Sequence, residues 1–359
     1  AVARIAKGTP AALGFRQPAE WETHRATWLG WPHHAEDWPG KLPAIVWVYT
    51  EIIRRLARHE QVSLLVQNAR GADSARAALG RAGVDLTKVE LVTIPTDRAW
   101  MRDSAPSFVK SDGEIAVVDW AFNGWAKYEN HLRDDRVPAR IAEHRALRRF
   151  VPKAPGQGGG SRVVVLEGGS IDLDGEGTML TTEECLLSEV QQRNPGLSRA
   201  DLERYFADYL GVERVLWLGR GIAGDDTHGH VDDLARFVRP GVVVIAREKN
   251  TSDENYEPLA ENLERLRAMT DFRGRKLEVV ELPMPAPVAF DAVRLPASYA
   301  NFYIANDLVL VPTFNDPNDR VALGILAELF PGREVVGIHA TDLVWGLGTL
   351  HCMSHEEPI

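Results

Sequence analysis

The chain has 359 residues, of which 45% are hydrophobic and 26% are charged, and its formal net charge is −10 at pH 7. This is an ordinary globular composition with enough chain to bury a substantial core, and no apolar run approaches the length of a membrane span. The acidic balance argues against a general nucleic-acid binder and is compatible with a small cationic substrate. We therefore expect neither a nucleic-acid nor a membrane partner, and a homo-oligomer is compatible with the sequence.

The chain contains two cysteines, Cys185 and Cys352. Two cysteines cannot form a disulfide framework for a chain of this size, so free thiols in reducing surroundings are expected. The first residues, AVARIAKGTPAALGF, contain no long apolar segment of the kind found in a signal peptide. We therefore expect a cytoplasmic protein, with an exported mature chain whose leader has been removed as the alternative.

Short apolar strands alternate with amphipathic helices from one end of the chain to the other. Strands are expected over residues 27–31, 62–66, 89–93, 115–119, 163–166, 178–182, 215–218, 242–246, 277–282, 308–312 and 334–338. The 3.6-residue periodicity predicts helices over residues 44–59, 129–150, 199–210, 256–269 and 319–329. Ser198 and Asp319 are the expected N-caps of the third and the last helix.

This pattern gives five helices, each preceded by two strands and followed by one, which favours an α/β protein with five ββαβ modules around an axis. No glycine-rich dinucleotide fingerprint follows the first strand, so a doubly wound sheet is disfavoured. Residues 151–162 have the composition of a linker, but strands and helices alternate on both sides of them. We expect a surface loop within a single catalytic domain of residues 1–359. Residues 172–177, DLDGEG, are expected to form a hairpin turn rather than a calcium loop.

Four segments place ionisable residues beside glycine or proline at strand ends, where functional loops are common. They are AWMRDSAP at 99–106, LEGGSIDLDG at 166–175, DDTHGHVDD at 225–233 and WGLGTLHCMSHEEP at 345–358. Cys352 in the last segment follows a Gly-x-Gly turn that lets backbone approach a ligand. A lone cysteine is more often a small buried hydrophobe, and that is the only interpretation we give Cys185.

The segment DDTHGHVDD is the densest in ionisable groups. If it forms a strand, His228, His230 and Asp232 share one face. Such a set suits zinc or manganese ligation, acid–base chemistry or a solvated acidic turn, and the segment alone leaves all three open. Asp103 suits a turn or a surface ion pair as well as a site. Glu167, which precedes two glycines, suits helix capping as well as a functional role.

Taken together in this order, the segments resemble the agmatine deiminase and bacterial peptidylarginine deiminase family of guanidine-modifying enzymes. The matching motifs are PAEWETHRATWLGWP, WMRDSAPSFV, FNGWAKY, EGGSIDLDGEGTMLTTEECLL with RNP, GHVDD, PASYANF and LGTLHCMSHEEP. They run over nearly the whole chain. The resemblance implies a five-bladed α/β propeller of ββαβ modules with pseudo-fivefold symmetry, an active site on its axis, and neither a metal nor an organic cofactor.

The resemblance also implies roles for individual residues. Cys352 matches the nucleophile, and His230 matches the general acid and base. Asp103 and Asp232 match the two carboxylates that bind the guanidinium, and Glu167 matches the carboxylate behind the histidine. Trp100 and Asn301 match residues of the family's pocket. Apart from the resemblance, further candidates for the pocket lining are Asp226, His33, His34 and Trp31.

The activity that the resemblance implies is hydrolysis of a guanidinium group through a covalent thiouronium on Cys352. Agmatine, giving N-carbamoylputrescine and ammonia, is the favoured substrate. Two carboxylates would hold the planar cation and fix its poorly electrophilic carbon over a thiolate. The alternatives are deimination of arginine or peptidylarginine to citrulline, amidinotransfer to an amine, and a catalytically silent propeller that binds guanidines.

Three positions depart from the pattern of typical agmatine deiminases. Ser104-Ala105 stands before Pro106 where a glycine is usual, and Ala126-Lys127 stands where two glycines follow NGW. Leu347 interrupts the glycine run before Cys352. None of these changes removes a catalytic group. We expect all three to line or support the pocket, so they bear on which guanidine is chosen.

Overall fold

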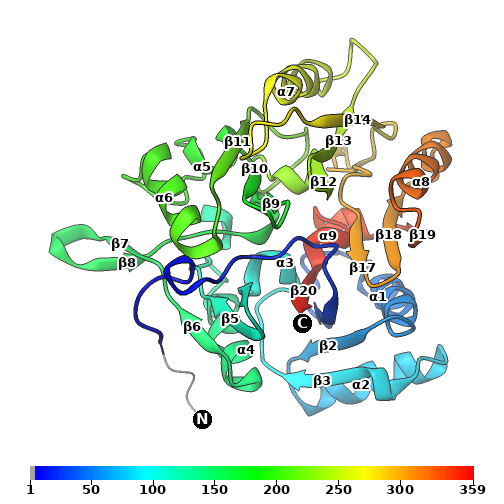
Figure 1. The fold of residues 1–359 in the computed structure, drawn as a ribbon. Helices are drawn as coiled ribbons and strands as arrows, with labels where there is room; N and C mark the ends of the chain where they lie inside the picture. The colour runs from blue at the N-terminus through cyan, green and yellow to red at the C-terminus, as the bar shows by residue number, and fades with distance from the viewer. Residues whose placement is uncertain (1–4) are drawn as a thin grey trace.

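The computed structural model describes residues 5–359 as a mixed α/β fold in which strands and helices alternate along the chain (Figure 1). The α-helices are α1 (Leu42–Leu56), α2 (Ala69–Arg81), α3 (Met101–Ser104), α4 (Val137–Arg145), α5 (Glu183–Leu187), α6 (Arg199–Leu210), α7 (Tyr256–Ala268), α8 (Pro317–Leu329) and α9 (Leu350–Met353). The strands of the first half are β1 (His24–Gly30), β2 (Gln61–Val66), β3 (Val89–Thr93), β4 (Ser107–Ser111), β5 (Glu114–Val118), β6 (Arg148–Phe150), β7 (Lys153–Pro155), β8 (Ser161–Val163), β9 (Asp172–Leu173) and β10 (Thr178–Thr182). Those of the second half are β11 (Arg214–Leu218), β12 (Ala235–Arg239), β13 (Val242–Arg247), β14 (Glu278–Pro283), β15 (Ala289–Phe290), β16 (Val293–Arg294), β17 (Tyr303–Ala305), β18 (Leu308–Thr313), β19 (Glu334–His339) and β20 (Ser354–Pro358).

Five sheets of the described chain share one connectivity. In each, an antiparallel pair of strands is extended by a parallel strand that the chain reaches through a helix. The sheets are β4-β5-β6 with α4, β9-β10-β11 with α5 and α6, β12-β13-β14 with α7, β17-β18-β19 with α8, and β20-β1-β2-β3 with α1 and α2. The last sheet joins the two ends of the chain, because β20 pairs antiparallel with β1.

The middle strands β13 and β18 are almost entirely buried, which explains why each of them is a nearly continuous apolar run in the sequence. In β13 the residues Val242–Ala246 are all buried, and in β18 the same holds for Leu308–Pro312. Helices lie outside the sheets and bury one face against them. Figure 1 shows the short helices α3 and α9 in the middle of the molecule, with the longer helices α2, α6, α7 and α8 toward its edge.

Most predicted elements are present, and the differences have identifiable causes. Helix α2 was missed because its buried face is made of alanines and one leucine, a weak apolar signal. The helix predicted over 129–150 is shorter, since α4 ends at Arg145 and β6 follows. Ser198 caps α6 in a capping box as predicted, whereas α8 is capped by Asp316, and Asp319 is its N3 partner in the box.

The two loops singled out in the sequence are both hairpins. Residues 151–162 lie largely within the β7–β8 hairpin, which projects from the body at the left of Figure 1. Residues 172–177 connect β9 to the antiparallel β10. There the Oδ1 atom of Asp174 accepts hydrogen bonds from the backbone N–H groups of Glu176, Gly177 and Thr178 at 2.8–2.9 Å. This turn, rather than a calcium loop, is what the structure contains.

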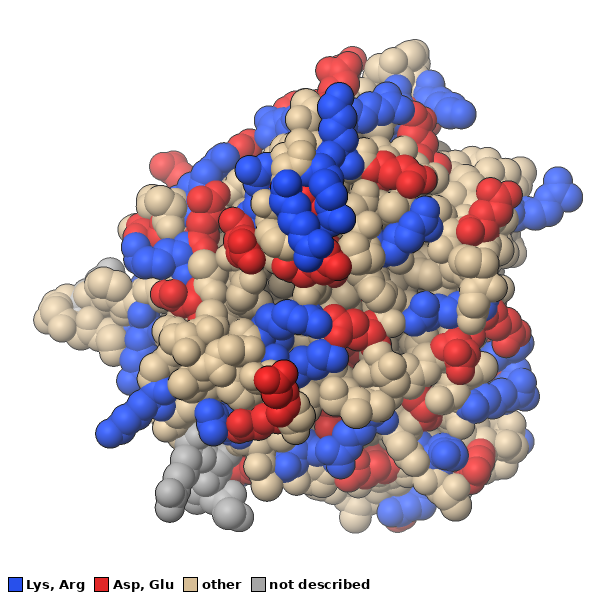
Figure 2. Space-filling view, in the orientation of Figure 1, with Lys and Arg blue, Asp and Glu red and all other residues tan. Residues whose placement is uncertain are grey.

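The charged side chains are mixed over the surface. Figure 2 shows acidic and basic residues interspersed across the face seen in Figure 1. A broad single-sign face of the kind that binds a nucleic-acid backbone is not seen in that view. None of the helices between residues 5 and 359 combines the length and the apolar composition that crossing a membrane requires.

Candidate active site

The predicted site residues come from five separated segments, and each segment leads into the antiparallel strand of one sheet. These pairs are Asp103 with β4, Glu167 with β9, Asp232 with β12, Asn301 with β17, and Cys352 with β20. Helix α3 contacts both α9 and the 3₁₀ turn η6 (Gly168–Ser170), which in turn contacts η7 (Val231–Asp233). The fold therefore gathers residues spread over 250 positions of the sequence.

A cavity of about 340 Å³ opens above these segments, a volume in the usual range for a small-molecule site. Cys352, Asp103, Trp100 and Asp226 line it, as the sequence predicts for a substrate pocket. The other lining residues are Glu36, Asp37, Pro39, Arg98, Trp125, Tyr128, Thr227, Val293, Leu295, Trp345, Gly346, Leu347 and Gly348. The lining combines several aromatic rings with carboxylates, which suits a cation with an apolar chain.

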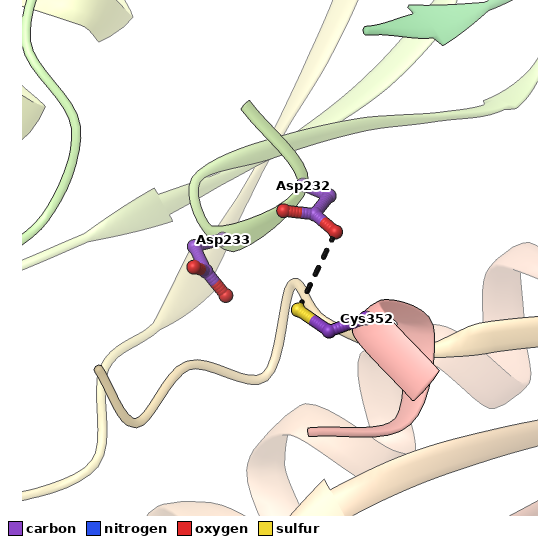
Figure 3. Close-up of side chains that lie close together, drawn as sticks. All are labelled: Asp232, Asp233 and Cys352. Carbon is purple, nitrogen blue, oxygen red and sulfur yellow. Dashed lines mark hydrogen bonds between the residues drawn. The ribbon is translucent and has the colours of Figure 1, made fainter. Parts of the chain in front are cut away.

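Cys352 lies on α9 at the floor of this cavity and is 7% exposed. Its Sγ atom lies 3.2 Å from Nδ2 of Asn301 and 3.7 Å from Oδ2 of Asp232 (Figure 3). Burial raises the pKa of the thiol well above its usual value, and the carboxyls of Asp232 and Asp233 add to this effect. In the free site the sulfur is therefore protonated, and a positive charge nearby would favour the thiolate.

Asn301 accepts hydrogen bonds from the segment that carries Cys352. Its Oδ1 accepts hydrogen bonds from the Thr349 hydroxyl at 2.7 Å and from the backbone N–H groups of His351 and Cys352 at 3.0 and 3.3 Å. Its Nδ2 donates to Oδ1 of Asp233 at 2.9 Å. Asn301 does not line the cavity, so its contacts are with the segment that carries Cys352 rather than with a pocket surface.

His230 lies between two carboxylates and is 1% exposed. Its Nδ1 is 3.9 Å from Oδ2 of Asp103, and its Nε2 is 4.0 Å from Oε1 of Glu167. Neither ring nitrogen has a hydrogen-bond partner among the described residues. Burial, and then the charge of Arg193, lower the pKa of His230 well below its usual value, so the free imidazole is neutral.

Glycine at position 169 is needed for this arrangement. A side chain there would place its Cβ 2.5 Å from Nδ1 of His230 and 2.9 Å from Oδ1 of Asp103. Its backbone N–H instead donates to that Asp103 oxygen at 2.9 Å. Behind the histidine, Oε1 of the fully buried Glu167 accepts a hydrogen bond from Nε of Arg193 at 2.8 Å. The ion pair compensates a charge that would otherwise be costly to bury.

The two carboxylates predicted to bind a guanidinium are both buried near the sulfur. Asp103 accepts from Nε1 of Trp125 at 2.8 Å, and burial with the charge of Glu167 raises its pKa to about 7. Burial and the charge of Asp103 raise the pKa of Asp232 well above its usual value. Oδ1 of Asp232 and Oε2 of Glu167 have no hydrogen-bond partner within the described chain. Buried polar atoms are normally paired, so this group of atoms is suited to a polar, cationic ligand.

The segment 225–233 does not form the strand on which the metal alternative depended. The carboxylate of Asp225 accepts from the backbone N–H groups of Gly229 and His230 and folds the segment into a turn. His228, with a φ of 65°, contacts Oγ of Ser188 at 3.2 Å, and its ring lies apart from the buried His230. His228, His230 and Asp232 thus form no common cluster. The Sγ and carboxylate oxygens that do lie within 4.8 Å of one another belong to Cys352, Asp232 and Asp233 (Figure 3).

The cavity mouth carries contacts that the sequence did not predict. Asp226 forms an ion pair with the exposed Lys127 and accepts a hydrogen bond of 2.6 Å from the Tyr128 hydroxyl. Asp37, which also lines the cavity, pairs with Arg98 and accepts from Nε1 of Trp100 at 3.1 Å. The motif FNGWAKY contains the Trp125–Tyr128 part of this lining, so its aromatic residues were the available signal.

Of the other candidates from the sequence, His33, His34 and Trp31 do not line the cavity. His33 contacts the Thr96 hydroxyl at 3.0 Å, and Trp31 is packed in the apolar core. The sequence analysis missed three residues of the site. His351 contacts Asp232, Arg193 pairs with Glu167, and Asp233 shares the Nδ2 group of Asn301 with Cys352. They lie within or beside motifs already identified, but their contacts depend on the fold.

Two departures from the family pattern place a residue other than glycine in the left-handed region, and one of them, Leu347, lines the cavity. Leu347 lines it with a φ of 69°, and Ala126 has a φ of 54°, so both occupy the left-handed region that favours glycine. The flanking Gly348 remains necessary, because a Cβ there would lie 2.9 Å from Cζ3 of Trp100 and 3.0 Å from Cβ of Cys352. Ser104 does not line the cavity, and its hydroxyl donates to the backbone oxygen of Trp100.

Comparison with known proteins gives one consistent result. Residues 16–358 match the family described as Porphyromonas-type peptidyl-arginine deiminase. The chain is 38% identical to the agmatine deiminase of Pseudomonas aeruginosa (strain LESB58), over 98% of this chain and 97% of the relative. It is similar to the structure of the Enterococcus faecalis agmatine deiminase (TM-score 0.89, 34% identity, 99% of each chain). It also resembles a cysteine-to-serine variant of the C. jejuni agmatine deiminase with substrate bound (TM-score 0.83, 28% identity, 96% of each chain). The chain therefore belongs to the Porphyromonas-type peptidyl-arginine deiminase family.

Proposed function

We propose that this enzyme hydrolyses agmatine to N-carbamoylputrescine and ammonia through a covalent thiouronium intermediate on Cys352. One observation carries the proposal: the buried Cys352 thiol and the Asp103 carboxylate line one cavity, and the carboxylate of Asp232 and the unpartnered imidazole of His230 lie buried directly beside them. These are the groups that guanidinium hydrolysis requires. The names of the similar proteins support agmatine as the substrate.

The first step is binding of the guanidinium by Asp103 and Asp232. Both carboxyls have raised pKa values in the free site. The entering cation favours their ionised forms, and each then accepts charge-assisted hydrogen bonds from the guanidinium nitrogens. The same cation favours ionisation of the Cys352 thiol, whose proton passes to the neutral His230. Substrate binding thereby activates its own nucleophile.

Attack of the thiolate on the guanidinium carbon forms the C–S bond and a tetrahedral adduct. The His230 imidazolium returns the thiol proton to one nitrogen, the C–N bond breaks, and ammonia leaves a thiouronium cation. Neutral His230 then removes a proton from water, whose oxygen attacks the same carbon. Collapse of that adduct breaks the C–S bond and regenerates the thiol. The overall change converts one guanidinium cation and one water into a neutral ureido product and one ammonium ion.

The Glu167–Arg193 pair has a supporting role in this scheme. Glu167 lies 4.0 Å from Nε2 of His230, close enough to stabilise the imidazolium that forms during each half-reaction. Arg193 compensates the glutamate charge when His230 is neutral. The carboxylate thus favours the imidazolium without itself taking part in proton transfer.

The cavity mouth favours agmatine over substrates that carry a carboxylate. Its two cationic lining or rim groups, Arg98 and Lys127, are already paired with Asp37 and Asp226. Glu36 is exposed, and the Trp125 ring lines the cavity, where an aromatic face can contact an ammonium group; the Tyr128 ring already has Cζ of Arg98 at 4.4 Å and Nζ of Lys127 at 5.5 Å from its centroid. Arginine or a peptidyl-arginine would bring a negative or bulky group to this mouth, and amidinotransfer would need a bound acceptor amine.

We further propose that residues 1–359 form a single catalytic domain, a five-bladed α/β propeller with pseudo-fivefold symmetry. Its support is the connectivity shared by five sheets and the way each sheet contributes one site segment at the start of its antiparallel strand. Pairing of β20 with β1 would close the ring. In such an arrangement the site lies on the axis, where five strand ends converge.

A substrate panel tests the proposed function. Purified enzyme is incubated separately with agmatine, free arginine, a peptide ending in arginine, and arcaine, and both ureido product and ammonia are measured. Equal amounts of the two products from agmatine, at a kcat/KM well above that for the other guanidines, are expected. A ureido product from arginine alone would establish the arginine alternative. Amidine transfer to an added amine without ammonia release would establish amidinotransfer, and no product from any guanidine would leave only guanidine binding.

A further inference from the structure

His351, the residue before the nucleophile, has a contact on each side of its ring with a carboxyl oxygen. Nδ1 lies 2.7 Å from Oδ2 of Asp232, and Nε2 lies 2.7 Å from Oε2 of Glu20. The ring is buried, at 1% exposure, and does not line the substrate cavity. The ring's contact on the side of Cys352 is with Asp232, which lies 3.7 Å from the sulfur and whose other oxygen has no hydrogen-bond partner among the described residues.

The two short contacts fix the number of protons in this row of three groups. A neutral imidazole carries one N–H, so with two ionised carboxylates one of the contacts would bring two lone pairs together. Both contacts are hydrogen bonds only when a second proton is present, on Asp232 or on the ring. Glu20, His351 and Asp232 together therefore carry two protons: one on the imidazole ring, and a second on either the ring or the Asp232 carboxyl.

The surrounding charges place that proton in the free enzyme. Although burial opposes it, Arg236, His351 and Arg102 hold the pKa of Glu20 well below its usual value, so Glu20 is ionised and accepts from Nε2. Burial, Arg102 and Arg236 lower the pKa of the His351 ring. The second proton then lies on the Asp232 side of the 2.7 Å contact. The charged or titratable groups that act on the ring or on Asp232 are Glu20, Arg102, Arg236, Asp103, Asp225 and Cys352, and His355 and Glu356 line the same small cavity as His351.

We propose that His351 is a positioning residue that takes up the Asp232 proton when the guanidinium binds and returns it when the product leaves. A guanidinium bonded to Oδ1 requires Asp232 as a carboxylate, and the proton moves along the contact from Oδ2 to Nδ1. Glu20 and Asp232 are then both carboxylates, His351 between them is an imidazolium, and both hydrogen bonds are kept. The substrate cation is thereby accepted without release of this proton to solvent. The inference rests on the proposed function, because it concerns how the same site takes its guanidinium.

Calorimetric proton counting tests this inference in the Cys352→Ala protein, which binds substrate without turnover. Agmatine is titrated at about pH 8.5, where Asp103 with its pKa of about 7 is ionised, in buffers of different ionisation enthalpy. We expect near-zero proton release. In the Cys352→Ala/His351→Asn protein the proton has no acceptor, so about one proton should be released per site, and the Kd should rise about tenfold for each unit of pH decrease.

The matched control is His355→Asn in the same Cys352→Ala background. His355 is also buried, at 3% exposure, but its ring contacts the backbone oxygen of Glu356 and has no hydrogen bond with Asp232. It should release no more protons than the parent. Equal proton release by the His351→Asn and His355→Asn proteins would overturn the proposal, and so would one proton released by the parent itself.

Nitrogen NMR of the imidazole rings gives an answer that does not require a substituted His351. In the Cys352→Ala protein the His351 ring nitrogens should change from imidazole to imidazolium shifts on addition of agmatine, and a ring that stays neutral in the complex would contradict the proposal. If the wild-type enzyme releases no ammonia from agmatine, the proposed function has failed rather than the proton inference. The same titration is then run with the guanidine that the substrate panel identifies.

Discussion

The Sγ atom of Cys352 lies 3.7 Å from Oδ2 of Asp232, and the second oxygen of that carboxylate is buried without a partner among the described residues. In the proposed mechanism, this carboxylate therefore contacts the nucleophile and keeps one oxygen free to accept a hydrogen bond from the guanidinium. Asp103, on α3, is a second buried carboxylate and lines the cavity together with Cys352. Together they can hold a planar cation so that its carbon faces the sulfur.

Replacing either carboxylate by its amide should damage both binding and attack. Asp232→Asn and Asp103→Asn each supply an N–H donor where the guanidinium needs an acceptor. Charge-assisted hydrogen bonds are worth about 1.5–3 kcal/mol each, and misplacement of the carbon adds to the loss. We expect kcat/KM for agmatine to fall at least about a hundredfold in steady-state assays.

His230→Gln should separate binding from chemistry. This variant should keep its affinity for agmatine while kcat collapses, because neither ammonia departure nor water activation has a proton carrier. For the two carboxylate variants of the preceding prediction, the control is Asp73→Asn at an exposed position, which should behave as wild type. A near-native kcat/KM in Asp103→Asn or Asp232→Asn would show that the two carboxylates do not share one guanidinium.

The pH dependence of kcat/KM should report Asp103. Its pKa is raised to about 7 in the free enzyme, and only the ionised form accepts from a guanidinium. The rate should therefore rise with pH through about 7 and fall as Asp103 is protonated below that value. The control is Asp119. Burial raises the pKa of its carboxyl to about 6, but it pairs with Arg149 and does not line the cavity. Asp119→Asn should keep the acidic limb, and a limb that persists unchanged in Asp103→Asn would assign it to another group.

Whether the sequence predicted a strand correctly depends on whether the residues of that strand are apolar or polar. Buried apolar strands such as β13 and β18 were predicted to within a residue or two because continuous apolar runs identify them. The strands β4, β9, β12, β17 and β20 were missed. They are short or carry buried polar side chains, such as Arg236 in β12 and Glu356 in β20, that serve the site and interrupt the apolar pattern.

The same distinction holds for the site itself. Cys352, Asp103 and Asp226 were identified from motifs, and all three line the cavity. That Asn301 supports the cysteine loop, and that Arg193 pairs with Glu167, could not be predicted, because each contact joins segments that only the fold brings together. His228 was grouped with His230 by strand alternation, and the Asp225-stabilised turn separates them.

Lys127 should weaken the recognition of agmatine's ammonium group. Lys127 belongs to the Ala126-Lys127 pair that stands where two glycines are usual, and it forms an ion pair with Oδ1 of Asp226 at the cavity mouth. Lys127→Met removes this competing cation, and a partly exposed ion pair of this kind is worth about 0.2–1 kcal/mol. We expect the KM for agmatine to fall, by up to about fivefold. Lys127→Arg and Lys110→Met, the latter at a pair with Glu22 elsewhere, should leave it unchanged. A higher KM in Lys127→Met would show that the lysine assists binding.

Activity should not depend on a metal ion. The proposed chemistry uses the guanidinium's own charge to ionise the thiol, so it needs no Lewis acid. Elemental analysis of the purified enzyme should find no stoichiometric zinc or manganese, and activity should survive prolonged treatment with chelator. One tightly held metal per chain, with activity lost on its removal and restored by its return, would refute this expectation.

The most direct test of the account is to trap its covalent intermediate. Wild-type enzyme is mixed with agmatine, quenched in acid within a turnover, digested and analysed by mass spectrometry, alongside Cys185→Ala and Cys352→Ala. We predict an amidino adduct on the peptide that contains Cys352, formed also in Cys185→Ala, and neither adduct nor ammonia in Cys352→Ala. Ammonia release by Cys352→Ala, or an adduct on Cys185 instead, would contradict the mechanism.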